Sequence, residues 1–198
     1  MTNVSETRDE QKERTRRRVR EAALEVFRRD GVAAASIDEV VKRAGTSRGT
    51  FYFHFPTKDD VLADVLSDSG KRAAAALDAL PVRTSLGKVL EALAMALAAE
   101  WQSDPSLFAE VGLVALRLTA AGKLTSETDP VRAAMARRFA ALQASHRLTR
   151  GLPAAMLADT FLLQAFAALS SWAARPDVPL GKVLRQVTRL FLEGAKAG

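Results

Sequence analysis

The 198-residue sequence contains no cysteine and only two histidines. The absence of cysteine excludes disulfide bonds, thiolate metal sites and a cysteine nucleophile. The two histidines, His54 and His146, are 92 positions apart, so a metal site built on histidine is not expected. We therefore predict a protein that carries neither a metal ion nor another cofactor.

Long hydrophobic runs and catalytic motifs are also lacking. The longest uncharged stretch, residues 160–174, has 15 residues and includes Gln164 and two serines, so it is too short and too polar to span a bilayer. The first 18 residues lack the apolar segment of a secretory signal. The sequence has no G-x-S-x-G, no H-E-x-x-H and no glycine-rich phosphate loop. We expect a cytoplasmic protein that is neither an enzyme nor bound to a membrane.

Acidic residues are fewer than basic ones, but the excess is modest. The chain has 29 Lys+Arg against 23 Asp+Glu, a net charge of +6. Residues 1–60 hold 13 basic and 11 acidic side chains, a net charge of only +2, so bulk charge does not predict DNA binding. Five arginines nevertheless fall within residues 14–20 with no acid among them. This segment either leads, solvated, into a helix or contacts phosphates, with Arg16 and Arg17 as candidate contacts.

No segment alternates polar and apolar residues with the period of a strand, whereas apolar residues recur at helical spacing throughout. We predict an all-α protein of about nine helices, preceded by a disordered polar tail over residues 1–12. Glycine and proline positions separate the helices. The predicted helices cover residues 13–30, 36–45, 47–55, a long segment from 57, and then 84–102, 105–121, 128–149, 153–174 and 178–196.

Residues 36–61 place two short helices on either side of Gly45-Thr46-Ser47, which is the helix-turn-helix arrangement. Short or polar residues begin the second helix and would let its end approach base edges. Arg48 is the only long donor there, and it could form two parallel hydrogen bonds to a guanine or contact a phosphate instead. The candidate DNA contacts at this helix are Thr46, Ser47, Arg48, Gly49 and Thr50.

The segment GTSRGTFYFHFPTKDDVL, from Gly45 to Leu62, closely resembles the tetracycline-repressor (TetR) family of bacterial transcription regulators. The sequence departs from the family pattern at Thr46, where Val or Ile is commoner, and at Phe51, where Leu is common. The resemblance covers about a quarter of the chain. It implies a helix-turn-helix DNA-binding domain over residues 13–58 and a ligand-binding and dimerisation domain over residues 59–198.

The resemblance also implies roles for single residues. Tyr52 and Lys58 would contact phosphates, and Ser36 is similarly placed at the start of its helix. His54 would lie near the DNA backbone or support the turn. Arg48, Gly49 and Thr50 would face base edges.

A homodimer is expected because one short helix reads only a few base pairs, so specific binding needs two half-sites. The segment 153–174 is apolar on most faces, more than packing within one chain requires. The resemblance implies that the last two helices of each subunit form a four-helix bundle. The candidate interface residues are Leu163, Ala167, Ser170, Val187 and Phe191.

The resemblance further implies a small-molecule pocket beneath the helix that begins near residue 57. The candidate wall residues are Trp101, Phe108, Leu116, Phe139, Gln143, Phe161, Gln164 and Trp172. We predict a repressor of a near-palindromic operator that a ligand releases by shifting the dimer between two arrangements. The alternative is a DNA-binding adaptor whose C-terminal part binds a protein. A cavity would favour the first hypothesis, and an exposed apolar groove the second.

Overall fold

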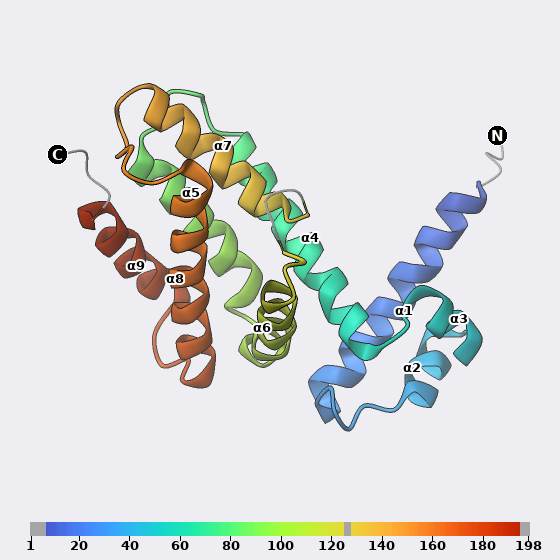
Figure 1. The fold of residues 1–198 in the computed structure, drawn as a ribbon. Helices are drawn as coiled ribbons and strands as arrows, with labels where there is room; N and C mark the ends of the chain where they lie inside the picture. The colour runs from blue at the N-terminus through green and yellow to red at the C-terminus, as the bar shows by residue number, and fades with distance from the viewer. Residues whose placement is uncertain (1–6, 125–127, 195–198) are drawn as a thin grey trace, which may run out of the picture. The chain divides into compact units, whose positions relative to one another are not determined.

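The computed structural model describes residues 7–124 and 128–194 and contains, over these ranges, nine α-helices and no strand (Figure 1). This confirms the predicted all-α fold. The helices are α1 (Arg8–Asp30), α2 (Ile37–Ala44), α3 (Arg48–His54), α4 (Lys58–Asp78), α5 (Leu86–Trp101), α6 (Pro105–Ala120), α7 (Pro130–Ala144), α8 (Ala154–Ala174) and α9 (Leu180–Gly194).

The chain forms two compact units, Met1–Leu62 and Ala63–Gly198. The helix α4 crosses the boundary between the two units. Val61 and Leu62, near its start, are fully buried and belong to the first unit. The assignment of DNA binding to residues 13–58 and of ligand binding to residues 59–198 stays a prediction.

The first helix begins at Arg8, five residues before the predicted start. Thr7 caps it by accepting a hydrogen bond from the Glu10 backbone N–H, while the Glu10 carboxylate accepts one from the Thr7 N–H at 2.7 Å. This capping box satisfies free N–H groups at the helix start, so a polar segment without an apolar stripe is still helical. The predicted disorder over residues 1–12 is therefore wrong for residues 7–12, and its residues 1–6 lie outside the described part.

The core of the first unit is built from the apolar stripe that the sequence predicts in α1. All five stripe residues are buried: Val19, Ala22, Ala23, Val26 and Phe27. The helix α2 buries Val40, Val41 and Ala44, while Ile37 is only half-buried. Because these side chains recur every three or four residues, each helix presents one continuous apolar face to the other.

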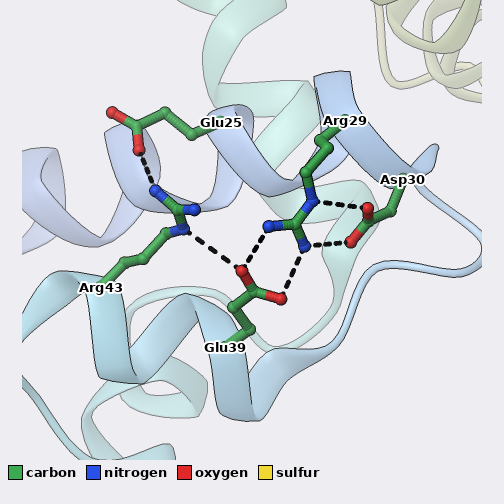
Figure 2. Close-up of polar contacts among 5 residues, drawn as sticks. All are labelled: Glu25, Arg29, Asp30, Glu39 and Arg43. Atoms are coloured by element: carbon green, nitrogen blue, oxygen red, sulfur yellow. Dashed lines mark hydrogen bonds and ion pairs between the residues drawn. The ribbon is translucent and has the colours of Figure 1, made fainter.

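A cluster of five charged side chains joins α1 to α2 on the outside of this core (Figure 2). The Arg29 guanidinium pairs with both oxygens of Glu39 at 2.6 Å and with Asp30. Arg43 contacts Glu39 and also Glu25, the latter at 3.0 Å. Hydrogen bonding to Arg29 lowers the pKa of Glu39. Glu39 is thus held by arginines, and Ser36 at the start of α2 makes no side-chain cap hydrogen bond.

The second unit is centred on three phenylalanines from three helices. Phe191 of α9 stacks on Phe139 of α7, with ring centroids 6.0 Å apart, and meets Phe161 of α8 edge-on at 5.1 Å. The helix α7 ends at Ala144, five residues before the predicted end. His146 then takes a positive φ of 56°, which no helix interior adopts. The predicted end of the last helix, residue 196, lies outside the described part.

By length and composition alone, α8 is apolar enough to cross a membrane, with a mean hydropathy of 1.3 over its most apolar window. It is the only such helix in the described ranges, and core helices of soluble proteins pass the same test, so this is weak support for a span. The uncharged stretch begins at residue 160, whereas the helix begins at Ala154 and includes Asp159. Only 28% of that window is buried, so much of α8 is uncovered by its own chain.

Candidate nucleic-acid interface and ligand cavity

The turn between α2 and α3 sets the direction of the candidate recognition helix. Gly45 ends α2 in the left-handed conformation, with φ 59° and ψ 46°, which favours glycine. Ser47 caps α3 by accepting a hydrogen bond from the Thr50 N–H at 3.1 Å, and its hydroxyl also lies 3.0 Å from that of Thr50. Two hydroxyls at the start of α3 are therefore used in holding the helix end in place.

Arg48, the predicted base-reading residue, is exposed at the first position of α3 and is held by a carboxylate. Its Nη1 donates to Asp38 Oδ1 at 2.7 Å. Both side chains are more than half exposed. The carboxylate of Asp38 raises the pKa of Arg48, with a smaller contribution from Tyr52. The guanidinium is therefore held in one orientation by Asp38, and any other partner of Arg48 must compete with that carboxylate.

The outward face of α3 carries Gly49, Tyr52 and Phe53. An added Cβ on Gly49 would meet only the Ser47 hydroxyl, at 3.7 Å, so the backbone here is open to approach by a large partner. Tyr52 is 44% exposed and its ring lies edge-on to the buried Phe51. This arrangement leaves the phenol hydroxyl able to donate to a phosphate.

Two predicted contacts, the half-buried Arg16 and the buried His54, are bonded to each other within the first unit. His54 is only 7% exposed, and its carbonyl accepts a hydrogen bond from Arg16 at 2.8 Å. The Arg16 guanidinium also lies 4.3 Å from the ring centroid of Phe55. Burial lowers the pKa of His54, and the charges of Arg16 and Lys12 lower it further. Arg16 and His54 thus join α1 to the end of α3.

The remaining predicted contacts lie at the edges of the helix-turn-helix. Lys58 donates to the carbonyls of Val32 and Ala33 at 2.8 and 3.0 Å, which fastens the start of α4 to the loop before α2. Ser36 is exposed and makes no cap bond, Arg17 is exposed, and Thr46 and Thr50 are half-buried. Of this group, Ser36 and Arg17 are the most accessible to a phosphate.

Sequence reasoning missed Asp38 as a partner of Arg48 and left Phe53 without a role. Phe53 is 69% exposed, and Lys12 lies over its ring at 5.4 Å. The position of Asp38, opposite the buried face of α2, could have indicated that it is exposed. Its pairing with Arg48 depends on the angle between two helices, which no local pattern contains.

The second unit contains a cavity of about 140 Å³ among α4, α5, α6, α7 and α8. Most of its wall is apolar, including Trp101 and Phe108, whose rings meet edge-on at 5.3 Å. Ser69, Thr119, Asp129 and Arg132 supply its polar groups. Asp129 caps α7 through the Val131 N–H and pairs with Arg132, and burial nevertheless raises the pKa of Asp129.

Three of the eight predicted wall residues line this cavity: Trp101, Phe108 and Leu116. The other five lie elsewhere. Phe139 and Phe161 are in the phenylalanine core, and Gln164 is exposed. Gln143 donates to the Thr149 and Leu152 carbonyls, and the Trp172 indole donates to the Val178 carbonyl at 2.8 Å. These two side chains hold loops, and whether any of the five contacts a ligand stays a prediction.

The predicted interface residues divide between surface and core. Leu163, Ala167 and Ser170 share one exposed face of α8. Val187 is half-buried, and Phe191 is 7% exposed within its own subunit. The accessible part of the prediction is therefore the α8 face. Within the described residues, no group of three or more acidic or histidine side chains is placed to hold a metal ion.

Comparison with known proteins agrees with this geometry. Residues 19–65 match the family described as bacterial regulatory proteins, tetR family. The chain is 47% identical over 55 residues to the HTH-type transcriptional regulator SrpR of Pseudomonas putida, covering 28% of this chain and 26% of SrpR. It is 39% identical over 57 residues to AcrR of Shigella flexneri, again covering 28% of this chain and 26% of the relative. The matches thus span about a quarter of these two regulators.

The similarity of the whole fold extends further. The crystal structure of Thermus thermophilus FadR, a TetR-family transcriptional repressor in complex with lauroyl-CoA, aligns with a TM-score of 0.71 and 26% identity. The alignment covers 90% of this chain and 94% of FadR. The similarity therefore includes the unit that holds the cavity as well as the helix-turn-helix.

Proposed function

This chain belongs to the tetR family of bacterial regulatory proteins, and we propose that it acts in the cytoplasm as a homodimeric repressor of a near-palindromic operator. A small molecule bound in the second unit releases it from DNA. The observation that carries the proposal is the exposed N-terminal end of α3, where Arg48 and Gly49 follow a capped turn and Tyr52 lies one turn further on.

Each α3 enters a major groove, with Arg48 directed at a guanine and Tyr52 at a phosphate. Ser36 and Arg17 add phosphate contacts from the start of α2 and from α1. Arg16, His54 and Lys58 support the helix-turn-helix from within, because their polar atoms are bonded to backbone groups or buried. A substitution at those three positions would act on DNA binding through stability.

The dimer forms through the exposed face of α8. The small and apolar side chains of Leu163, Ala167 and Ser170 allow a second helix to approach closely, and an uncovered apolar helix in water is unfavourable. The exposed surface of α9 is mixed, because it carries Lys182, Arg185 and Arg189 as well as Leu190, which is 69% exposed. A symmetric contact would place the same α8 face on both subunits.

Release depends on α4, which begins in the first unit and lines the cavity with Leu66, Ser69, Gly70 and Ala73. A ligand that binds better to one arrangement of α4 shifts the population of dimers toward that arrangement. A coupling of about 1–3 kcal/mol would lower DNA affinity by roughly 5–150-fold. The cavity favours a small-molecule effector over a protein-binding adaptor.

Selection from a random DNA pool at about 150 mM salt tests the DNA-binding part of this proposal. A near-palindromic consensus is expected. Arg48→Ala should relax the preference at one position per half-site, while Tyr52→Phe should weaken binding to all sequences alike. Recovery of no consensus, with the protein folded and dimeric, would contradict operator recognition by α3.

A further inference from the structure

The cavity in the second unit has a size and a charge arrangement that restrict what it can hold. Its volume of about 140 Å³ is close to that of an engineered protein cavity of roughly 150 Å³ that binds benzene. A molecule with a single six-membered ring and a short substituent therefore fits.

The charged groups beside the cavity are already paired with one another. Arg132 pairs with Asp129 at 3.2 Å and also with Asp159, so one guanidinium faces two carboxylates. The side chains of Arg132 and Asp129 are each only 16% exposed. An anionic ligand would find no uncompensated positive charge in this wall. A cation would lose its hydration beside the guanidinium, and burying either ion without a partner is costly.

Two hydroxyls line the cavity, those of Ser69 and Thr119, and the Thr119 hydroxyl already donates to the Ala115 carbonyl at 2.9 Å. The buried Arg132 Nε makes no hydrogen bond within the described ranges, but it lies 3.2 Å from an oxygen of Asp129. Ser69 lines the cavity from α4 and is buried, at 6% exposure, and no hydrogen bond from its hydroxyl is seen among the described residues. A buried hydroxyl gains from a partner and can both donate and accept. Directly beside it, Gly70 lets α7 come close, since an added Cβ would lie 3.4 Å from Asp129 Oδ1. The polar part of the cavity thus lies where α4 meets the start of α7.

We propose that the effector is a small, neutral, mainly apolar molecule of about one ring, with one carbonyl or ether oxygen that accepts a hydrogen bond from Ser69. This inference rests on the proposed function, because it names the class of ligand for the same cavity. The hydrogen bond from Ser69 would place the ligand's polar atom in direct contact with α4, the helix that begins in the first unit.

Four probes of similar shape test the proposal on the full chain without DNA: ethylbenzene, acetophenone, benzoate and 1-phenylethylamine, the last as its cation. Calorimetric titration should rank acetophenone about 5- to 10-fold tighter than ethylbenzene, the value of one hydrogen bond. Benzoate and the amine should not bind at millimolar concentration. Because Trp101 lines the cavity and Trp172 does not, quenching of Trp101 emission in a Trp172→Phe chain locates the probe.

Ser69→Ala is the matched variant, since it removes one oxygen and leaves the wall otherwise unchanged. It should abolish the preference for acetophenone while ethylbenzene binds as before. A preference that survives in Ser69→Ala, tight binding of benzoate, or no binding of any probe would overturn the inference. Operator selection is independent of these titrations. If an operator is found but no probe binds, the ligand class is wrong while DNA recognition stands.

Discussion

The Nη1 atom of Arg48 lies 2.7 Å from Oδ1 of Asp38, so the candidate base-reading side chain of α3 is paired with the first turn of α2. Exposed ion pairs contribute little to stability. If Arg48 reads a guanine as proposed, the effect of this pair is on DNA binding, because the guanine competes with the carboxylate of Asp38 for the guanidinium.

Asp38→Asn should strengthen binding to the selected operator by about 2- to 5-fold, because an exposed ion pair is a weak competitor for Arg48. Fluorescence anisotropy with operator DNA measures this. The effect should largely disappear in an Arg48→Ala background, as a double-mutant cycle would show. Glu21→Gln, which removes one exposed negative charge from α1, controls for net charge. An equal gain in the Arg48→Ala background would mean that Asp38 acts only by repelling phosphates.

His54 should make the stability of the first unit depend on pH. Burial and the nearby charges of Arg16 and Lys12 lower its pKa in the folded state, so the folded unit holds His54 neutral. The unfolded chain binds the proton first as pH falls below 6.5. The contribution of neutral His54 to stability is therefore complete above that pH and is lost as pH falls through the lowered folded value.

Hydrogen exchange of peptides from residues 7–62, followed by mass spectrometry between pH 7.5 and 5.5, measures this loss after correction for intrinsic exchange rates. The His54→Gln chain should show a weaker pH dependence over the same interval. Identical pH dependence in both chains would mean that His54 does not carry the effect.

A charge on the exposed face of α8 should break the proposed dimer. Ala167→Glu places a carboxylate against its own symmetry mate, and burying like charges is unfavourable. Sedimentation should give the mass of one chain, and operator affinity should fall toward that of a single half-site. Ala140→Glu, at an exposed alanine of α7, should leave the dimer intact. A dimer that persists in Ala167→Glu would exclude this α8 face.

Alanine substitutions at Phe139 and Leu116, both expected in the ligand wall, should lower the free energy of unfolding by very different amounts. Phe139→Ala removes a fully buried ring stacked on Phe191 and should lower the free energy of unfolding by about 3–5 kcal/mol. Leu116 lines the cavity but is 53% exposed, so Leu116→Ala should have a much smaller effect. Chemical denaturation followed by circular dichroism compares the two. Equal losses would contradict the assignment of Phe139 to the core.

The sequence by itself determined the features that depend on neighbouring residues. The stripe from Val19 to Phe27 is entirely buried because residues three and four apart share one helix face. Gly45 ends α2 because it adopts a left-handed backbone at little cost, and Pro105 and Pro130 begin α6 and α7 because the first helical turn needs no N–H from them.

Only the tertiary structure decided what each inward or outward side chain meets. Helical spacing places Phe139 and Trp101 on inner faces alike, but packing of distant helices puts one in the core and the other at the cavity. Likewise, Arg16 and Arg48 are both arginines near the helix-turn-helix, yet one is bonded to a carbonyl and the other paired with Asp38. These outcomes depend on angles and distances between helices, which arise from the packing of the whole unit and not from local spacing.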